Sequence, residues 1–217
     1  MHRSTPKQYL LLQGRPVLCH TVMAFNKCSE VDKIILVVPE KDIPYCRDQL
    51  LSDLYLEIPI DVLAGGQRRQ DSVFNGILSI EDRESIVVIH DGVRPLVRPE
   101  MISACINKAR TSGACILGIP VQDTLKSVRG DGAIQGTIQR EKLWLAQTPQ
   151  AFHYQLIRNA HTAASRDGVE GTDDAMLLER MGVPVNILLS RRENLKITTN
   201  EDLMLADAIL SQARKEN

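Results

Sequence analysis

The sequence predicts an α/β fold with a doubly wound, mostly parallel sheet, in a single domain over residues 1–217. Short β-branched apolar runs alternate along the chain with longer segments of helical periodicity. The apolar runs are nearly continuous rather than alternating with polar residues, as expected when helices cover both faces of a parallel sheet. Aromatic residues make up only 4% of the chain. The core must therefore be filled mainly by Leu, Ile, Val and Ala.

The predicted elements follow one another as strand, helix and strand, which favours a doubly wound α/β layer fold. Strands are expected at 33–39, 58–63, 85–91, 114–121 and 183–189. Helices are expected at 16–27, 41–53, 71–80, 99–111, 155–165, 173–181 and 201–213.

One region, residues 122–147, interrupts this alternation and is too long for an ordinary connection. The pattern DTLKSV, GDG and AIQGTI predicts two short strands joined by a glycine-rich turn. We expect a projecting β-arm at about 121–143. Because a two-stranded ribbon is only marginally stable alone, this arm indicates a homodimer.

Charge and composition exclude several classes of function. The 26 basic and 27 acidic residues give a net charge of -1, which speaks against a nucleic-acid-binding face or a membrane-surface patch. No apolar run approaches the ~18 residues of a membrane span. The five cysteines form no CxxC pair, and most lie in apolar segments, so we expect reduced core thiols. A cytoplasmic enzyme or small-molecule binder fits best.

Two predicted strand ends carry polar residues that suit an anionic ligand. The sequence AGGQRRQDSV (64–73) combines a glycine-rich turn with a helix start, although a plain turn with a Ser or Asp N-cap is an equal alternative. Asp91 and Arg94 follow the strand at 85–91. Asp91 is a candidate Mg²⁺ ligand, and a surface ion pair is the alternative.

Other candidates are weaker when taken singly. Lys7, Arg140 and Lys196 are each more typical of solvated surface charge, although the apolar flanks of Lys196 suggest a strand end. His90 is expected to be a hydrogen-bonded histidine rather than a catalytic one, because no Ser or Cys nucleophile is suitably placed.

Two further segments offer hydroxyl groups. QTPQAF (147–152) predicts a turn through Pro149 with Thr148 as a donor, and GTDDAML (171–177) predicts a helix start capped by Thr172. Together, the glycine turn, the strand-end carboxylate and the scattered cations suit a phosphorylated nucleotide. Phosphoryl or nucleotidyl transfer needs charge neutralisation and alignment rather than a covalent nucleophile.

Seven motifs, in order, carry a resemblance that spans essentially the whole chain: PKQYL (6–10), AGGQRRQDSV (64–73), HDGVRP (90–95), PVQDTLK (120–126), LWLAQTPQAF (143–152), TDDA (172–175) and NLKITTNEDL (194–203). The chain resembles the 2-C-methyl-D-erythritol 4-phosphate cytidylyltransferases, Rossmann-like nucleotidyltransferases of the non-mevalonate isoprenoid pathway. The resemblance implies transfer of CMP from CTP to methylerythritol phosphate, with Mg²⁺ as cofactor and pyrophosphate and 4-diphosphocytidyl-2-C-methyl-D-erythritol as products. It also implies a homodimer whose arm reaches the partner's active site.

The resemblance assigns roles to individual residues. Lys7 stabilises charge on the α-phosphate, while Arg140 and Lys196 position the methylerythritol phosphate that attacks it. The implied nucleotide-binding residues are Gly66, Gln67, Ser72, Asp91 and Gly92, with Asp91 also the metal ligand. The implied substrate-binding residues are Arg94, Thr124, Arg140, Thr148 and Thr172, of which Thr124 and Arg140 come from the neighbouring subunit's arm.

The chain departs from the family at its start. The family opens with a strand and a glycine-rich loop ending in Arg-Met, and Met1 stands where that Met is expected. The strand, the loop and its arginine would precede residue 1. Losing about five buried apolar residues costs on the order of 10 kcal/mol, comparable to a whole domain's stability. Residues 1–217 alone are therefore expected to be poorly stable and nearly inactive.

Two alternatives stay open at this point. Ribitol-5-phosphate cytidylyltransferase is similar in fold and nucleotide loop, but Lys126 and the LW beside Arg140 favour the methylerythritol branch. The other alternative is a catalytically impaired, truncated form. The presence of Lys7, Asp91, Arg140 and Lys196 argues against it, because an inactive remnant has no physical reason to keep scattered cations.

Overall fold

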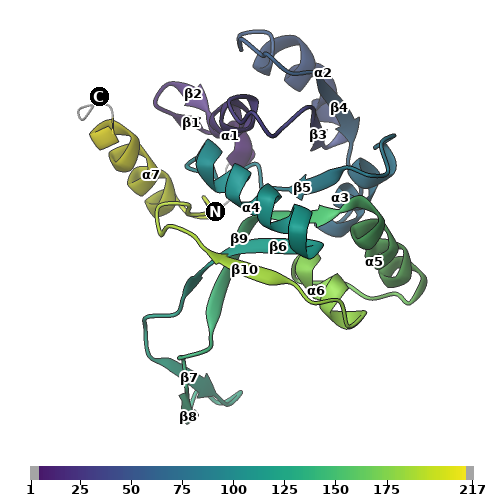
Figure 1. Cartoon of the computed structure of the whole chain (residues 1–217). Coiled ribbons are helices and arrows are strands. Elements are labelled where there is room, and N and C mark those ends of the chain that lie inside the picture. The colour runs from purple at the N-terminus through teal and green to yellow at the C-terminus, as the bar shows by residue number, and fades with distance from the viewer. Residues whose placement is uncertain (1–4, 214–217) are drawn as a thin grey trace.

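The computed structural model describes residues 5–213 and has the predicted α/β architecture (Figure 1). Its strands are β1 (Leu11–Leu12), β2 (Arg15–Pro16), β3 (Ile34–Val38), β4 (Ile60–Ala64), β5 (Ile86–Ile89), β6 (Ala114–Pro120), β7 (Leu125–Val128), β8 (Ile134–Ile138), β9 (Trp144–His153) and β10 (Asn186–Leu189). Its α-helices are α1 (Val17–Asn26), α2 (Ile43–Tyr45), α3 (Arg69–Leu78), α4 (Pro99–Ser112), α5 (Tyr154–Arg166), α6 (Asp174–Arg180) and α7 (Asn200–Ala213). Short helical turns are η1 (Lys7–Tyr9), η2 (Glu40–Asp42) and η3 (Cys46–Leu50).

The main sheet has the order β10-β6-β9-β5, and helices pack on both of its faces. Strand β6 shows the two faces, because successive side chains of a strand point in opposite directions. Cys115 and Leu117 pack in a core cluster with Cys105 and Ala109 of α4. Ala114 and Ile116 pack in the opposite cluster, with residues of α3, α5 and α6. The five predicted strands and this layered arrangement are confirmed.

Strand β9 corrects one expectation, because the predicted turn through Pro149 lies inside a ten-residue strand. β9 runs antiparallel to both of its neighbours, whereas β10 and β6 are parallel. The register of β6 against β9 shifts between the pairs Leu117–Gln147 and Ile116–Gln150, so Thr148 and Pro149 lie in a β-bulge. Proline has no N–H to donate, and a bulge is where a central strand tolerates it.

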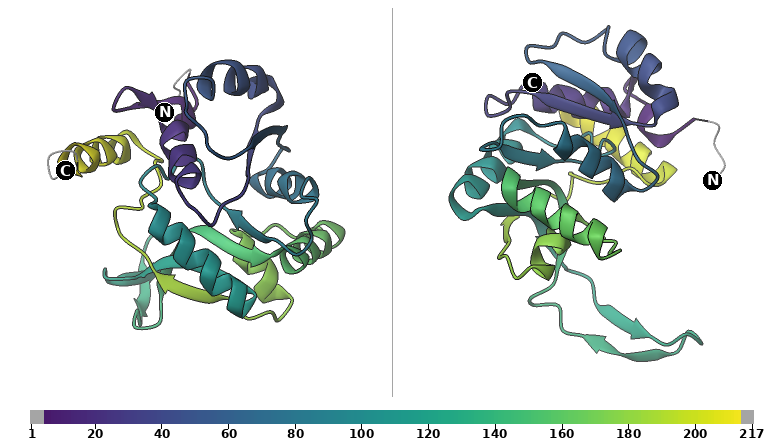
Figure 2. Two further views of the ribbon diagram at one scale, coloured as in Figure 1. Left: turned by 45° about the horizontal axis from the view of Figure 1, so that its top comes forward. Right: turned by 90° about the vertical axis from the view of Figure 1, so that its right-hand side faces the viewer.

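The β-arm is confirmed as a hairpin of β7 and β8 that projects from the body of the molecule (Figure 2, right). Its turn uses Gly132 with a φ of 84°, a backbone conformation that favours glycine. Its apolar side chains are exposed, with Val128 53%, Ile134 65% and Ile138 45% accessible.

A slot separates the main sheet from a second, two-stranded sheet of β3 and β4. Within residues 5–213, β3 pairs only with β4 and β5 only with β9. Between them is a cavity of about 1060 Å³, lined by both strands and by side chains of α1 and α3. The strand and loop that the resemblance places before residue 1 lie outside the described residues. The low stability and activity expected for residues 1–217 stay predictions.

Three smaller observations complete the fold. The predicted helix at 41–53 is broken into η2, α2 and η3, so that expectation is only partly right. All five cysteines are free and buried, as predicted. Over residues 5–213, none of the helices has the length and apolar character needed to traverse a lipid bilayer.

Candidate active site

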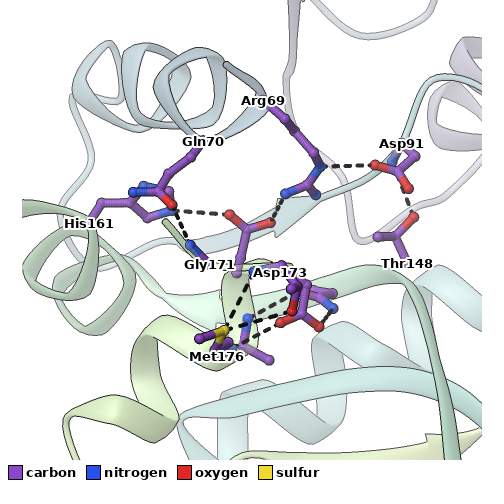
Figure 3. Close-up of polar contacts among 12 residues, drawn as sticks. Arg69, Gln70, Asp91, Thr148, His161, Gly171, Asp173 and Met176 are labelled. Carbon is purple, nitrogen blue, oxygen red and sulfur yellow. Dashed lines mark hydrogen bonds and ion pairs between the residues drawn. The ribbon is translucent and has the colours of Figure 1, made fainter. Parts of the chain in front are cut away.

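The candidate site lies where β5 ends, next to the β-bulge of β9. Asp91 follows β5 by two residues, and its backbone N–H donates a hydrogen bond to the Thr148 hydroxyl over 3.1 Å (Figure 3). Thr148 is only 4% exposed, and its carbonyl accepts a hydrogen bond of 2.9 Å from Asn194. The bulge therefore places Thr148 against the strand end that carries Asp91.

Asp91 is surrounded by three cationic side chains. Its carboxylate lies 3.2 Å from Arg69 Nε, 3.0 Å from Lys196 Nζ and 3.6 Å from Arg94 Nε. Burial by itself would raise the pKa of Asp91, but the charges of Arg69 and Lys196 outweigh it and hold the pKa below its usual value. We call Asp91, Arg69, Arg94 and Lys196 the Asp91 cluster. Its three cations exceed its one carboxylate, which suits an anionic ligand.

The alternative of a surface ion pair for Asp91 and Arg94 is wrong. Their side chains are only 12% and 10% exposed. Arg94 also donates a 2.7 Å hydrogen bond to the Asn194 carbonyl, which fixes the loop after β10 against the end of β5.

Lys196 reaches the cluster from a loop and not from the strand end that its apolar neighbours suggested. The neighbouring Ile197 is 1% exposed, and its N–H donates to the Val93 carbonyl over 2.8 Å. The apolar residue next to Lys196 is thus buried, and it holds the loop that carries Lys196 beside the end of β5.

The glycine-rich turn after β4 folds tightly onto the start of α3. The Gly66 N–H donates to the Ser72 hydroxyl over 3.0 Å. A Cβ on Gly65 would lie 2.7 Å from Ser72 Oγ, and one on Gly66 would lie 2.4 Å from Asp71 Cβ, so neither position admits a side chain without a shift. Gly66 and Gln67 are exposed. Their predicted role toward a nucleotide stays a prediction.

Arg69 is the residue of this site that sequence reasoning did not single out. It begins α3 and bridges Asp91 to Asp174, with Nη1 2.8 Å from the Asp174 carboxylate. The neighbouring Arg68 instead pairs with Asp71 at 2.7 Å, near the surface. By residue type and position the two adjacent arginines are alike. Only the contacts with Asp91 and Asp174, which are distant in the sequence, distinguish Arg69 as the residue of the site.

Three other predicted residues have different outcomes. The Gly92 carbonyl accepts a 3.1 Å hydrogen bond from Thr21, which ties the site to α1. Lys7 is exposed on η1, and its neighbour Gln8 lines the same cavity as Arg69, Asp91 and Lys196. Thr172 is not the helix cap that we expected. Asp173 caps α6 instead, because its carboxylate accepts the Met176 N–H.

The two predicted arm residues do not join the cluster within one chain. Thr124 and Arg140 are exposed, and the Arg140 guanidinium donates to the Gln122 carbonyl in the same arm. Figure 1 shows the arm leaving the body beyond the ends of β6 and β9. Among the described residues, neither side chain forms a hydrogen bond or ion pair with the Asp91 cluster.

His90 is a buried, hydrogen-bonded histidine, as predicted. Its Nε2 lies 3.3 Å from the Arg94 carbonyl, and its ring lies 5.1 Å from that of Phe25. Burial lowers its pKa from 6.5 to about 4, because the charged imidazolium would lose its hydration. The ring is thus neutral at physiological pH and structural in role.

Acid is therefore expected to destabilise the protein through His90. Between pH 6.5 and 4 the unfolded chain takes up the proton more readily than the folded chain. The buried, neutral His90 thus adds to the free energy of unfolding. This contribution is complete above pH 6.5, falls as the pH drops toward 4, and amounts to on the order of 3 kcal/mol. Urea unfolding across this range tests it, and His90→Phe should flatten the pH dependence. An equally steep dependence in His90→Phe would contradict the assignment.

Comparison with known proteins agrees with this geometry. The family model described as 2-C-methyl-D-erythritol 4-phosphate cytidylyltransferase matches residues 1–212. The enzyme of that name from Syntrophus aciditrophicus is 46% identical over 212 residues, covering 98% of this chain and 91% of the relative. The one from Geotalea uraniireducens is 42% identical, covering 97% and 91%.

Solved structures agree with these sequence relatives. The 4-diphosphocytidyl-2C-methyl-D-erythritol synthase of Anaerococcus prevotii has a TM-score of 0.86 at 31% identity, covering 95% of this chain and 90% of that one. The cytidylyltransferase of Thermus thermophilus has a TM-score of 0.79 at 32% identity, covering 95% and 94%. The chain therefore belongs to the 2-C-methyl-D-erythritol 4-phosphate cytidylyltransferase family, nucleotidyltransferases that transfer CMP from CTP to methylerythritol phosphate in isoprenoid precursor biosynthesis.

Proposed function

We propose that the Asp91 cluster is the place where CTP and methylerythritol phosphate react. The observation that carries this proposal is the packing of Arg69, Arg94 and Lys196 around one largely buried carboxylate. Arg69 also pairs with Asp174, so three cations face two carboxylates and an excess of positive charge is left for phosphate groups. A cavity that opens beside Asp91 and Lys196 supports the same assignment.

The nucleotide is proposed to bind along the turn between β4 and α3. Gly66, Gln67 and Ser72 belong to that turn, and Gly92 follows Asp91. The close contact of the two glycines with α3 keeps the turn free of side chains, so that phosphate can approach the backbone. The positive end of the α3 dipole favours the same ligand.

The reaction is a direct displacement at phosphorus. An oxygen of the methylerythritol phosphate forms a bond to the α-phosphorus of CTP, and the bond from that phosphorus to the pyrophosphate oxygen breaks. Pyrophosphate leaves with the electron pair, and no proton must be removed because the attacking phosphate is already an anion. Lys7 is proposed to neutralise the developing charge, Lys196 to position the methylerythritol phosphate, and Arg94, Thr148 and Thr172 to orient the same substrate.

Mg²⁺ is proposed to bind at Asp91 together with the nucleotide. Within residues 5–213, no group of three His, Cys, Asp or Glu side chains could hold a metal. One carboxylate nevertheless suits Mg²⁺, which is often held by one or two carboxylates with substrate phosphates and water. When bound, the ion would neutralise and align the phosphate groups.

A homodimer is proposed to complete the site. The exposed apolar residues Val128, Ile134 and Ile138 of the arm favour cover by a second copy of the chain. In such a dimer each arm would bring Thr124 and Arg140 to the partner's Asp91 cluster. The buried free thiols support a reducing compartment, so we place the enzyme in the cytoplasm.

Lys196→Met is expected to weaken binding of methylerythritol phosphate about tenfold, because one charge-assisted contact to its phosphate is lost. Isothermal titration calorimetry measures this directly. Lys27→Met is the matched control, since Lys27 is an exposed lysine at the end of α1. Equal affinity in Lys196→Met and the unmodified protein would contradict the proposed site.

A further inference from the structure

A second carboxylate, Asp174, lies behind the cluster and is buried. It begins α6, is 1% exposed, and lies 2.8 Å from Arg69 Nη1. Its other oxygen is 3.1 Å from Nε2 of His161, a residue of α5 that is itself 1% exposed. Figure 3 shows Arg69 with Asp91 on one side of it and His161 on the other. Three helices thus meet around one ion pair.

The carboxylate of Asp174 is not needed for the start of α6. Asp173 supplies the cap by accepting the Met176 N–H over 3.0 Å. Gln150 Oε1 accepts the Ala175 N–H over 3.2 Å. Burying a carboxylate is costly unless a cation or hydrogen bonds compensate it. Among residues 5–213, the side chains that compensate this carboxylate are those of Arg69 and His161, so Asp174 can act on the site only through them.

His161 fixes the orientation of this carboxylate. Because a carboxylate only accepts hydrogen bonds, Nε2 carries the hydrogen and donates it to Asp174. The ring also stacks on Phe74 of α3, with centroids 5.6 Å apart and 17° between the ring planes. His161 of α5 thereby holds one oxygen of the Asp174 carboxylate, while the other oxygen faces Arg69.

Arg69 is therefore shared by two carboxylates of different accessibility. Asp91 also contacts Lys196 and Arg94, and it faces the cavity. The side chain of Asp174 is 2% exposed, and within residues 5–213 it contacts Arg69 and His161 alone. When Asp91 turns to a metal or a substrate, Asp174 still holds the Arg69 guanidinium in place.

We propose that Asp174, oriented by His161, is a positioning residue that holds Arg69 toward the triphosphate of the nucleotide. This rests on the proposed function, since it takes the turn before α3 as the nucleotide site. Arg69 is the group that contacts phosphate, and Asp174 acts only through it. A guanidinium fixed at one nitrogen keeps other N–H donors for a phosphate oxygen.

A double-mutant cycle on the Kd of CTP with Mg²⁺ tests the proposal by calorimetry. Asp174→Asn is expected to weaken binding about tenfold, and Arg69→Met at least as much. In the Arg69→Met background, Asp174→Asn should have no further effect, because its only route to the ligand is gone. The same factor in both backgrounds would overturn the proposal and leave Asp174 a structural residue.

His161→Gln gives a second route if Asp174→Asn fails to fold. It retains a donor, and its weaker effect on the Kd should also vanish in the Arg69→Met background. An effect that persists there would overturn the proposal. Steady-state kinetics should show the KM for CTP raised several-fold more than kcat is lowered, because a positioning residue for the nucleotide acts mainly on binding.

Asp167→Asn is the matched control. Asp167 also contacts arginines, Arg166 at 2.8 Å and Arg180 at 2.5 Å, and lies between α5 and α6. It is not part of the Asp91 cluster, so its loss should leave the Kd unchanged. If the unmodified protein itself failed to bind CTP, the proposed function would be wrong. Binding with an additive cycle would reject only the role of Asp174.

Discussion

Asp91→Asn is expected to lower kcat/KM for cytidylyl transfer by about 100- to 1000-fold, the range seen when one preorganised electrostatic contact is removed. The carboxylate contacts Arg69, Arg94 and Lys196, so its neutral analogue leaves three cations that repel one another. It also removes the negative charge proposed to bind Mg²⁺. Measurement of pyrophosphate release at matched concentrations of both substrates gives the effect.

The control separates this loss from unfolding. Asp61→Asn removes an exposed carboxylate that pairs with Lys33 at 2.6 Å, outside the Asp91 cluster. It should leave the rate nearly unchanged, since exposed ion pairs contribute about 0–1 kcal/mol. Thermal melts of both variants then show whether the fold survives. A folded Asp91→Asn protein with an ordinary rate would remove Asp91 from the site.

Mixing two inactive variants is expected to restore about a quarter of the unmodified activity, provided that arms are exchanged between subunits. The variants are Asp91→Asn and Arg140→Met. In a mixed dimer, the subunit with intact Asp91 receives the arm with intact Arg140, and its site is whole. The other site of that dimer lacks both groups. With random pairing, half of the dimers have one working site in two.

The geometry of a single chain motivates this experiment. Arg140 lies on the exposed arm and bonds to the Gln122 carbonyl, without contact to Asp91. Each variant alone, after the same dissociation and reassociation, is the control. Light scattering must show that dimers have formed. Dimers that regain no activity would contradict the sharing of Arg140 between subunits.

The strands were largely predictable because their apolar runs are continuous, as in β3 and β5, and end at turn residues. β9 was not, because its Pro149 signals a turn, and only the pairing with β6 reveals the bulge that accommodates it. The antiparallel direction of β9 is likewise a property of its neighbours and not of its own sequence.

The candidate site was predictable where a residue follows a strand directly. Asp91 and Arg94 come at the end of β5, and the structure places them with Lys196. Arg69 could not be separated from Arg68, because its partner Asp174 is distant in the sequence. Thr172 and Asp173 are both residue types that cap helices, although Asp is the stronger of the two. Backbone geometry at the start of α6 selects Asp173.

Pyrophosphate release from CTP and Mg²⁺ with methylerythritol phosphate, and in parallel with ribitol 5-phosphate, tests the central claim most directly. The deciding quantity is the ratio of the two rates, because a ratio does not depend on the absolute rate of the preparation. The account predicts a ratio of about tenfold or more in favour of methylerythritol phosphate. Equal rates with the two substrates, or a preference for ribitol 5-phosphate, would contradict it.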